Sequence, residues 1–354
     1  MPGVQGGVER HCEALYPLLA GHNGVTVRVY RRKPYLTPDS RDARFDGISF
    51  VDLPSTRVRG LEAVLHTLLA TVHIAFHRPS VVHVHNMGPA FVAPLLRLLR
   101  LPVVMTYHSV NYEHKKWGPI GRALLHLSER VALRCCNRII FVSRARFDAM
   151  PQWVKNKSTY IPNGVDEPHL NVGTDFLLRH GIHPGQYVLA VGRLAPEKGF
   201  DHLIKAAQRC DALSQLVIAG NDDHNGDYRR RLEALDSAGK TIFTGYTTGD
   251  DLAALYRHAR LFVLPSLSEG APLVMLEAMS YSLPILASDI PATRQLPLDP
   301  DNFFRPDDDN SLADALARTL ATPQHPTHYN LTPYNWNTIA TATLSQLHPS
   351  PFKP

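Results

Sequence analysis

The chain has little of what marks a disulfide-stapled, membrane-spanning or secreted protein. Its 354 residues include four cysteines with no paired framework, so reduced thiols in a cytosolic protein are the expectation. No apolar run approaches the roughly 18 residues that a spanning helix needs. Residues 1–20 carry Glu9, Arg10 and Glu13 where a signal peptide would need its apolar stretch. Membrane spanning and secretion through a cleaved leader are therefore not expected.

Aromatic residues are also scarce, at 8% of the chain, and no helix-turn-helix, zinc-finger or RNA-binding signature occurs. Nucleic acid is therefore not an expected partner. Charge is divided unevenly along the chain. Residues 1–160 hold 22 Lys and Arg against 10 Asp and Glu, a net charge of +12, whereas residues 161–354 hold 15 against 22, a net charge of −7. The basic half should attract anionic surfaces.

The hydrophobic fraction of 44% and the charged fraction of 19% suit a globular protein of about two domains. Apolar, β-rich runs alternate with amphipathic stretches, which predicts an α/β fold with parallel sheets. Strands are expected at residues 25–30, 80–85, 102–107, 138–142, 187–191, 215–219, 241–243, 261–264 and 284–287. Helices are expected at residues 60–76, 89–99, 117–136, 200–209, 228–238, 250–258, 273–282, 311–321 and 334–347. The pattern predicts two doubly wound halves.

A domain boundary is expected where the charge changes sign. Residues 160–166 read Tyr-Ile-Pro-Asn-Gly-Val-Asp, which has the Pro and Asn-Gly chemistry of a turn. We therefore predict an N-terminal domain over 1–160 and a C-terminal domain over 161–332. Residues 333–354 form a helix and tail that should cross back to the first domain. Open parallel sheets bind ligands beyond the carboxyl ends of their strands.

Residues 265–279, Pro-Ser-Leu-Ser-Glu-Gly-Ala-Pro-Leu-Val-Met-Leu-Glu-Ala-Met, follow an apolar strand and open a helix. Pro272 fits the first helical turn, and the free amides of such a turn favour phosphate. Glu269 precedes the helix and Glu277 lies about two turns into it, so their carboxylates could accept hydrogen bonds from sugar hydroxyls. The alternative is a simple capping loop in which Glu277 is an ordinary helix residue.

A second candidate, Val-Gly-Arg-Leu-Ala-Pro-Glu-Lys-Gly at residues 191–199, lies between a strand and a helix. Arg193 could fork to diphosphate oxygens while Lys198 acts as a point charge. The alternative is two solvated surface cations.

The Glu-x7-Glu spacing of Glu269 and Glu277, with its flanking Glu-Gly and Leu-Glu-Ala-Met, resembles the retaining glycosyltransferases of family 4. The resemblance implies a GT-B fold, in which two Rossmann-like, doubly wound domains face a central cleft. It also implies transfer of a hexose from a UDP- or GDP-sugar to a glycan or lipid-linked acceptor, without a metal or a further cofactor. Glu269 would contact the sugar near the reacting carbon, and Glu277 would hold the ribose. Arg193 and Lys198 would neutralise the leaving diphosphate.

The same resemblance assigns further donor contacts. Pro272 stands where many members have Gly, so phosphate contacts would rest on Gly270, Ala271 and Leu273. The regions around Gly220 and Tyr246 would border the nucleotide base.

Near the start of the chain, Gly6 and Gly7 resemble the Gly-Gly loop that brings backbone amides close to the donor phosphate. The family normally has a whole strand before this loop. We therefore expect either that the first sheet lacks its first strand or that the native start lies upstream of Met1.

Histidines supply the last candidates. His108, directly after an expected strand, resembles the family's active-site His, which would hydrogen-bond the donor sugar or the acceptor. Asn111 stands where relatives often have Asp, so the acid–base role on the acceptor side stays open. His83 and His85 alternate on one expected strand and could suggest a metal. Because the sequence reveals no third ligand and the family uses none, a structural role is expected for both.

The acceptor is expected at the cytoplasmic membrane, in surface polysaccharide or lipopolysaccharide synthesis. Arg57-Val-Arg59 and Lys115-Lys-Trp117 each lead into an amphipathic stretch, an arrangement suited to an anionic bilayer. The protein is therefore expected in the cytoplasm and peripherally on the inner face of the membrane. Two other functions remain open, a non-catalytic binding subunit and a nucleotide-sugar epimerase, since fold alone does not determine function.

Overall fold

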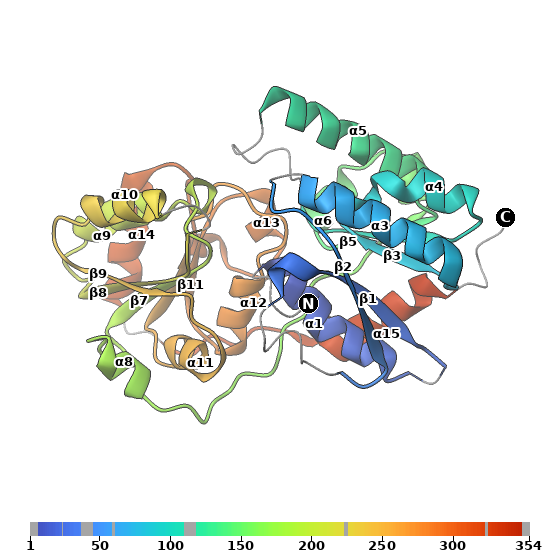
Figure 1. The fold of residues 1–354 in the computed structure, drawn as a ribbon. Helices are drawn as coiled ribbons and strands as arrows, with labels where there is room; N and C mark the ends of the chain where they lie inside the picture. The colour runs from blue at the N-terminus through green and yellow to red at the C-terminus, as the bar shows by residue number, and fades with distance from the viewer. Residues whose placement is uncertain are drawn as a thin grey trace. The chain divides into compact units, whose positions relative to one another are not determined.

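The computed structural model describes residues 6–22, 24–36, 45–58, 61–109, 118–222, 226–322 and 325–348. The chain forms two compact units, Met1–Gly164 with Pro333–Pro354, and Val165–Thr332 (Figure 1). The division falls after Gly164, because the residues just before it belong to the first unit. The Asn163 side chain bonds His11, and Gly164 lies so close to the Trp336 ring that a Cβ would overlap it.

The first unit contains two parallel sheets. β1 (Val27–Arg32) pairs with β2 (Ile48–Leu53). The larger sheet has the order β3 (Val82–His85), β4 (Val103–Tyr107), β5 (Arg138–Phe141) and β6 (Ser158–Tyr160). Among the described residues no strand precedes the first helix, and none joins β1 to β3.

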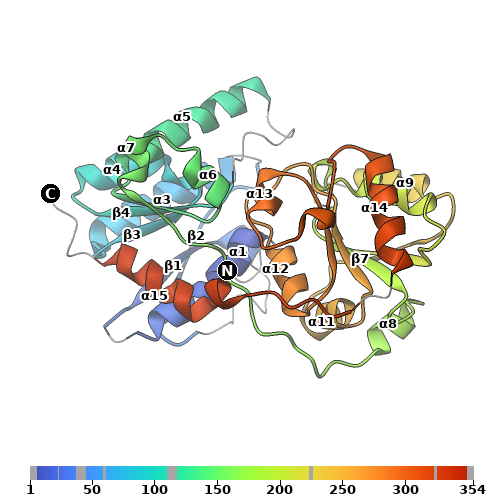
Figure 2. The ribbon, with the colours of Figure 1, turned by 180° about the vertical axis from the view of Figure 1, so that it is seen from behind.

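Helices cover both faces of the larger sheet. α1 (Gly7–Ala20) and α15 (Trp336–Leu347) pack against each other on one face, as Figure 2 shows. α3 (Leu61–His77), α4 (Ala93–Leu98) and α5 (Pro119–Cys135) lie on the other face. β4 connects the two layers because alternate strand residues point to opposite faces. Val104 packs with Leu15 and Ile339, whereas Val103 and Met105 face the opposite core. Short helices complete the unit: η1 (Lys33–Tyr35), η2 (Pro89–Val92), α6 (Arg144–Asp148), α7 (Gln152–Lys155) and η6 (Thr332–Tyr334).

The second unit is built on one parallel sheet of six strands in the order β12-β11-β10-β7-β8-β9. The strands are β7 (Tyr187–Val191), β8 (Gln215–Ala219), β9 (Thr241–Gly245), β10 (Leu261–Leu264), β11 (Ile285–Ser288) and β12 (Phe303–Phe304). The chain starts in the middle at β7, winds out to β9, then returns to β10 on the other side. This is the doubly wound order, whose ligand crevice lies at the carboxyl ends of the two central strands. Here those strands are β7 and β10.

Helices again cover both faces of the sheet. α9 (Phe200–Gln208) lies between α10 (Asp227–Leu235) and α14 (Asp309–Ala321) on one face (Figure 1). α11 (Gly249–Arg257) and α12 (Leu273–Ser280) lie on the other. The remaining helices are α8 (Asp175–Arg179), α13 (Pro291–Arg294), η4 (Pro196–Lys198) and η5 (Pro300–Asn302). None of the helices described in either unit is both long enough and apolar enough to cross a membrane.

Most expected elements are confirmed, and three expectations are corrected. Strands β7, β8 and β10 have the predicted bounds. The helix expected over 89–99 is instead a 3-10 turn, η2, followed by α4, because the backbone changes its hydrogen-bonding pattern at Ala93. The helix expected from residue 334 begins at Trp336, where the Asn335 side chain caps it. Pro272, expected in the first helical turn, is instead the N-cap of α12, which begins at Leu273 as expected.

Candidate active site

The loops after β7 and β10 lie side by side because these strands are neighbours in the sheet. The first loop carries Arg193 and Lys198, and the second carries Glu269. Lys198 donates through Nζ to Glu269 Oε1 at 2.5 Å. Their side chains are 18% and 10% exposed. The two motifs, far apart in sequence, therefore meet in one half-buried ion pair at the carboxyl edge of the sheet.

Two further contacts hold this pair in place. Ser266 donates its hydroxyl to the same Oε1 of Glu269, at 2.7 Å. The backbone amide of Leu267 donates to the carbonyl of Glu197 at 2.9 Å, which ties the two loops together directly. The Glu269 carboxylate is thus oriented by two donors on one oxygen, and charge-assisted bonds of this kind are the strong ones.

Arg193 lies at the start of the first loop and is 38% exposed at its side chain. Its guanidinium pairs with Glu197 at 3.2 Å, within the same loop. The loop therefore presents two cations, and each is partnered by a carboxylate. An incoming diphosphate would exchange those carboxylates for phosphate oxygens.

Two glycines allow the loops to approach so closely. Gly199 has φ of +66°, and a Cβ there would lie 2.2 Å from the Pro265 carbonyl oxygen. Gly220 has φ of +154°, and a Cβ there would lie 1.8 Å from the Gly192 carbonyl oxygen. Contacts this short exclude any side chain. Gly220 thus determines how close the end of β8 comes to the loop that carries Arg193.

Glu277 lies inside α12 and is buried, at 9% exposure. Its Oε2 accepts a hydrogen bond of 2.8 Å from the Tyr256 hydroxyl on α11. The ring of Tyr256 stacks on Tyr281, with centroids 5.5 Å apart. Glu277 is therefore not an ordinary solvated helix residue, because its position is held by a buried partner.

The other residues expected to contact the donor lie before α12 and after β9 in the second unit. Gly270 and Ala271 lie in the loop before α12, and Leu273 is the first helical residue. All three are half-buried. Tyr246 follows β9 and is 52% exposed. No side chain caps the start of α12 at Pro272, and the start of a helix is a place where phosphate commonly binds.

In the first unit, Gly6 is the N-cap of α1 and Gly7 its first residue. The segment expected to be a glycine loop is thus the start of a helix of 14 residues, which the sequence pattern did not predict. Residues 2–5 of the motif lie outside the described residues, as do Asn111 and the segment Lys115 to Trp117.

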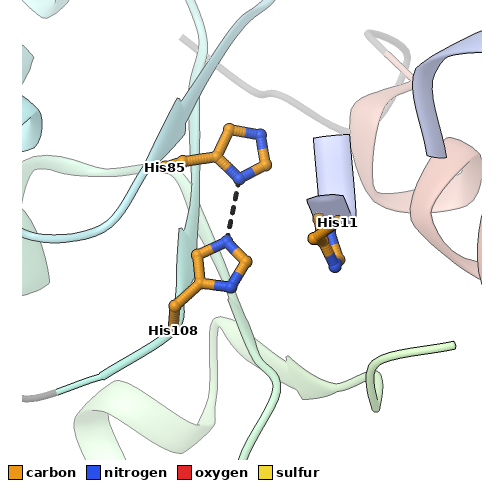
Figure 3. Close-up of side chains that lie close together, drawn as sticks. All are labelled: His11, His85 and His108. Carbon is orange, nitrogen blue, oxygen red and sulfur yellow. Dashed lines mark hydrogen bonds between the residues drawn. The ribbon is translucent and has the colours of Figure 1, made fainter. Parts of the chain in front are cut away.

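His108 comes directly after β4 and is 8% exposed. Its Nε2 is 2.9 Å from His85 Nδ1 at the end of β3. A third imidazole, His11 on α1, lies across from the pair, as Figure 3 shows, with its ring 4.8 Å from that of His108. One ligand nitrogen from each of the three lies within 4.8 Å of the others. The sequence had revealed no third histidine to go with His83 and His85, whereas the fold places both His11 and His108 beside His85.

Outer hydrogen bonds orient these rings. His11 Nδ1 is 3.0 Å from Asn163 Oδ1. His85 Nε2 is 2.6 Å from the Tyr16 hydroxyl, which is also 3.1 Å from His83 Nδ1. His83 and His85 share one face of β3 because they are two residues apart. That face looks toward α1, from which both Tyr16 and His11 come.

Burial keeps the imidazoles neutral. It lowers the pKa of His11 to about 4, although the bond to Asn163 opposes the shift. It lowers the pKa of His83 to about 3, with the charge of His11 as a second cause. The pKa values of His85 and His108 are also well below the usual value, first through burial and then through neighbouring imidazoles. Near neutral pH, all four rings therefore offer lone pairs rather than positive charge.

Several residues that shape these sites had not been expected from the sequence. Ser266 and Glu197 lie inside the two recognised loops. Their short distance along the chain from Glu269 and Arg193 is the sequence signal that points to them. Tyr256 lies on α11 in an apolar stretch and carries no sequence signal. His11 stands four residues after Gly7, and nothing in the sequence connects it with His85.

The fold is shared with solved structures of sugar-transferring enzymes. Sucrose-phosphate synthase of Thermosynechococcus elongatus superposes with a TM-score of 0.80 at 22% identity, covering 96% of this chain and 92% of that one. Anabaena HepE, solved in complex with UDP-glucose, superposes with a TM-score of 0.72 at 17% identity, covering 98% and 93%. Two doubly wound units of this kind define a GT-B glycosyltransferase fold.

The family follows from the sequence matches. Residues 5–168 match the family described as Glycosyltransferase Family 4, and residues 180–335 match Glycosyl transferases group 1. An uncharacterised glycosyltransferase of Methanocaldococcus jannaschii is 26% identical over an alignment of 332 residues, and the match covers 82% of this chain and 78% of that protein. The O-antigen chain mannosyltransferase of Salmonella typhimurium is 24% identical over 241 residues, 67% of this chain and 65% of that protein. The chain belongs to glycosyltransferase family 4.

Proposed function

We propose that the protein transfers a hexose, with retention, from a UDP- or GDP-sugar to a hydroxyl of a glycan or lipid-linked acceptor. The contact between Lys198 and Glu269 carries the proposal, because it joins the two motifs at the edge where a doubly wound sheet binds ligands. HepE was solved with UDP-glucose, and the Salmonella relative is a mannosyltransferase. Both support a nucleotide sugar as donor.

The proposed reaction needs charge stabilisation more than it needs a nucleophile on the protein. Breaking the bond between sugar and phosphate develops negative charge on the leaving diphosphate. Arg193 and Lys198 would neutralise that charge, so the transfer itself requires no metal. The acceptor hydroxyl would attack from the leaving-group face, with the departing phosphate oxygen taking its proton. Glu269 suits a binding role, since an oxygen already held by Lys198 and Ser266 is a weak nucleophile.

Each candidate residue has a proposed place around the donor. Glu269 and His108 would contact the transferred sugar, and Glu277 would hold the ribose. The remaining donor contacts are Gly6, Gly7, Gly270, Ala271 and Leu273 for the phosphates, with Gly220 and Tyr246 for the base.

The donor assignment predicts that the two carboxylates behave differently toward free UDP or GDP. Glu277→Ala removes an acceptor for the ribose hydroxyls and should weaken binding about 10- to 100-fold, the usual range for a hydrogen bond to a charged group. Glu269→Ala should leave the affinity unchanged or raise it, because it frees Lys198 for the diphosphate. Its cost should appear instead in turnover. Calorimetric titration with each nucleotide measures the affinities.

Two further variants make that titration decisive. Asp314→Ala removes an exposed carboxylate on α14 in the same unit and should leave nucleotide affinity unchanged. Glu277→Gln keeps the shape of the buried side chain beside Tyr256, so it separates loss of charge from loss of packing. Equal weakening by the Glu269 and Glu277 changes would contradict separate roles, and absence of nucleotide binding by the wild type would overturn the proposed function.

A membrane-bound acceptor is supported by α3, which buries two threonines and exposes an apolar face. The face of α3 that packs on the unit carries Thr67 and Thr71, whose hydroxyls bond to carbonyls four residues earlier. The exposed face is apolar and ends at Phe76, which is 83% exposed. The apolar stripe, defined by its exposed residues, comprises Leu61, Val64, Leu65, Leu68, Val72 and Phe76. α3 buries Ile74 but points most of its larger apolar side chains outward, and such a surface is suited to an interface.

Exposed cations flank α3 along the chain and lie on the neighbouring helices of the same layer. Arg57 precedes α3 and Arg78 follows it, and Arg78 donates to the Leu99 carbonyl just past α4. Arg97 and Arg122 are exposed on α4 and α5, which lie in the same layer. Apolar side chains among arginines fit an anionic bilayer surface. We therefore propose a peripheral position on the inner face of the cytoplasmic membrane, where lipid-linked acceptors of surface polysaccharide or lipopolysaccharide synthesis lie.

The protein should sediment with vesicles of phosphatidylglycerol and phosphatidylcholine at low salt. Each basic side chain near the surface contributes about 1 kcal/mol, and attachment should weaken as salt shortens the screening length. Leu65→Glu with Val72→Glu places two negative charges in the apolar stripe and should reduce vesicle binding at least 10-fold.

Leu178→Glu is the matched control, because Leu178 is 63% exposed on α8 of the other unit. It should leave vesicle binding unchanged. A wild-type protein that stays in the supernatant at low salt would defeat the membrane proposal. Self-association that disappears in the Leu65 and Val72 variant would instead assign the apolar stripe to a second copy of the chain.

A further inference from the structure

Three imidazoles from distant parts of the first unit lie close together (Figure 3). His11 comes from α1, His85 from the end of β3 and His108 from just beyond β4. His11 and His108 are buried, and His85 is half-buried. One nitrogen of each lies within 4.8 Å of the other two. Imidazole nitrogens at this spacing are the ligand type that zinc, copper and nickel prefer.

The outer hydrogen bonds decide which nitrogens are available. An amide oxygen only accepts, so His11 donates Nδ1–H to Asn163 Oδ1 and keeps a lone pair on Nε2. Along the other branch, His83 Nε2 is 2.7 Å from the Thr106 hydroxyl. When His83 donates there, its Nδ1 accepts from Tyr16, and the Tyr16 oxygen accepts from His85 Nε2–H. His85 then keeps its lone pair on Nδ1, the nitrogen that faces His108.

These bonds resemble the supports of a metal site. Metal-bound histidines commonly donate their other N–H to an oxygen, which fixes ring orientation and raises basicity. His11 and His85 both have such a partner, Asn163 and Tyr16. With His85 in this tautomer, its inner lone pair and the nitrogen of His108 face each other at 2.9 Å. Two lone pairs so placed repel unless a proton or a cation lies between them.

We propose that His11, His85 and His108 bind one divalent transition-metal ion, and that Zn²⁺ is the ion their chemistry fits best. Zinc–imidazole bonds of 2.0–2.1 Å in a tetrahedron place the nitrogens about 3.4 Å apart. The observed spacings, 2.9 Å between His85 and His108 and at most 4.8 Å within the set, lie on both sides of that value. Three protein ligands leave the fourth position for water or an anion.

The charge state of the rings suits the ion. A neutral imidazole binds Zn²⁺ through one nitrogen lone pair, and each of the three rings has two ring nitrogens, of which one would serve as ligand. The hydrogen now shared by His85 and His108 moves to the outer nitrogen of His108, with no net proton released. The metal site lies in the first unit, whereas Arg193 and Lys198 lie in the second. The metal site shares His108 with the proposed function, in which that ring would contact the transferred sugar, and it goes beyond that function because the proposed transfer uses no metal. Metal titration without a donor distinguishes failure of the metal site from failure of the transfer reaction.

The test is titration of the chelator-treated full chain with Co²⁺, whose tetrahedral complexes absorb visible light, followed by displacement with Zn²⁺. We expect one equivalent to bind with a tetrahedral spectrum. His11→Ala and His85→Ala should each weaken binding at least 100-fold, since even changes to outer partners of ligands cost 10- to 100-fold. Thermal unfolding of the metal-free variants shows whether they fold.

His77→Ala is the control. His77 stacks on His73 with ring centroids 3.8 Å apart on exposed α3, so this pair is a rival surface site. Its removal should leave the tight Co²⁺ site unchanged. The proposal is overturned if the wild-type chain shows no stoichiometric Co²⁺ binding, or if His77→Ala abolishes binding that His11→Ala leaves intact. The wild-type titration decides the matter even where a histidine variant does not fold.

Discussion

Replacing Lys198 by Ala is expected to lower kcat about 100-fold with any accepted donor. A single preorganised electrostatic donor to developing charge contributes on the order of 3 kcal/mol to transition-state stabilisation. Lys198 is held for that role by its 2.5 Å bond to Glu269, in a place that is only 18% exposed. Arg193→Ala should act in the same direction, because its guanidinium lies at the start of the same loop. Steady-state turnover of a UDP- or GDP-sugar measures both effects.

The same substitution leaves Glu269 without its cation at 10% exposure, so some loss of stability is also expected. Adding Glu269→Gln to Lys198→Ala should recover the stability but not the turnover. Lys205→Ala is the matched control, since Lys205 also pairs with a carboxylate, Asp309, but on α9 away from the strand ends. Turnover of the Lys198 variant within threefold of the wild type would refute the diphosphate assignment.

A large loss of stability is expected from Gly199→Ala. Gly199 adopts φ of +66°, where an L-residue costs about 1–2 kcal/mol. Its Cβ would also lie 2.2 Å from the Pro265 carbonyl oxygen, and such overlap in a packed site costs about 1–3 kcal/mol. A total of about 3 kcal/mol should lower the melting temperature of this unit by about 10 °C. Turnover should also fall, because displacing Pro265 moves the loop that carries Ser266 and Glu269.

Gly239→Ala separates the two causes of that instability. Gly239 has nearly the same φ, +64°, and a Cβ added to it would meet nothing within 4 Å. It should therefore show only the backbone cost, about 1–2 kcal/mol. Calorimetric unfolding of both variants is the measurement. If Gly199→Ala proves no more destabilising than Gly239→Ala, the close approach of the two loops is not a constraint on the fold.

Much of the second unit could be predicted from local pattern. β7, β8 and β10 are apolar runs that end in Gly or Pro, so both their existence and their bounds were evident. β12 spans two residues, Phe303–Phe304, and β6 spans three, too short for any periodic signal. In the first unit α1 was missed because its glycine start resembled a loop and Pro17 interrupts its pattern.

The motifs of the candidate site could be predicted from the sequence, but the contacts between them could not. The spacing of Glu269 and Glu277 and the loop of Arg193 and Lys198 were visible in the sequence because each motif is a few residues long. That Lys198 meets Glu269 was not visible, because their contact depends on β7 and β10 being neighbours. The partner of Glu277, Tyr256, comes from a different helix whose apolar pattern conceals a hydroxyl with a specific bond.

The sequence by itself determined the fold class, the family and the candidate residues of the loops after β7 and β10, because these depend on local periodicity and short motifs. Only the tertiary structure decided the Lys198–Glu269 ion pair, the outward apolar stripe of α3 and the meeting of His11, His85 and His108. The physical reason is that strand order and helix packing bring together residues that no local spacing relates. A histidine becomes a ligand only when other elements place a second and a third nitrogen beside it.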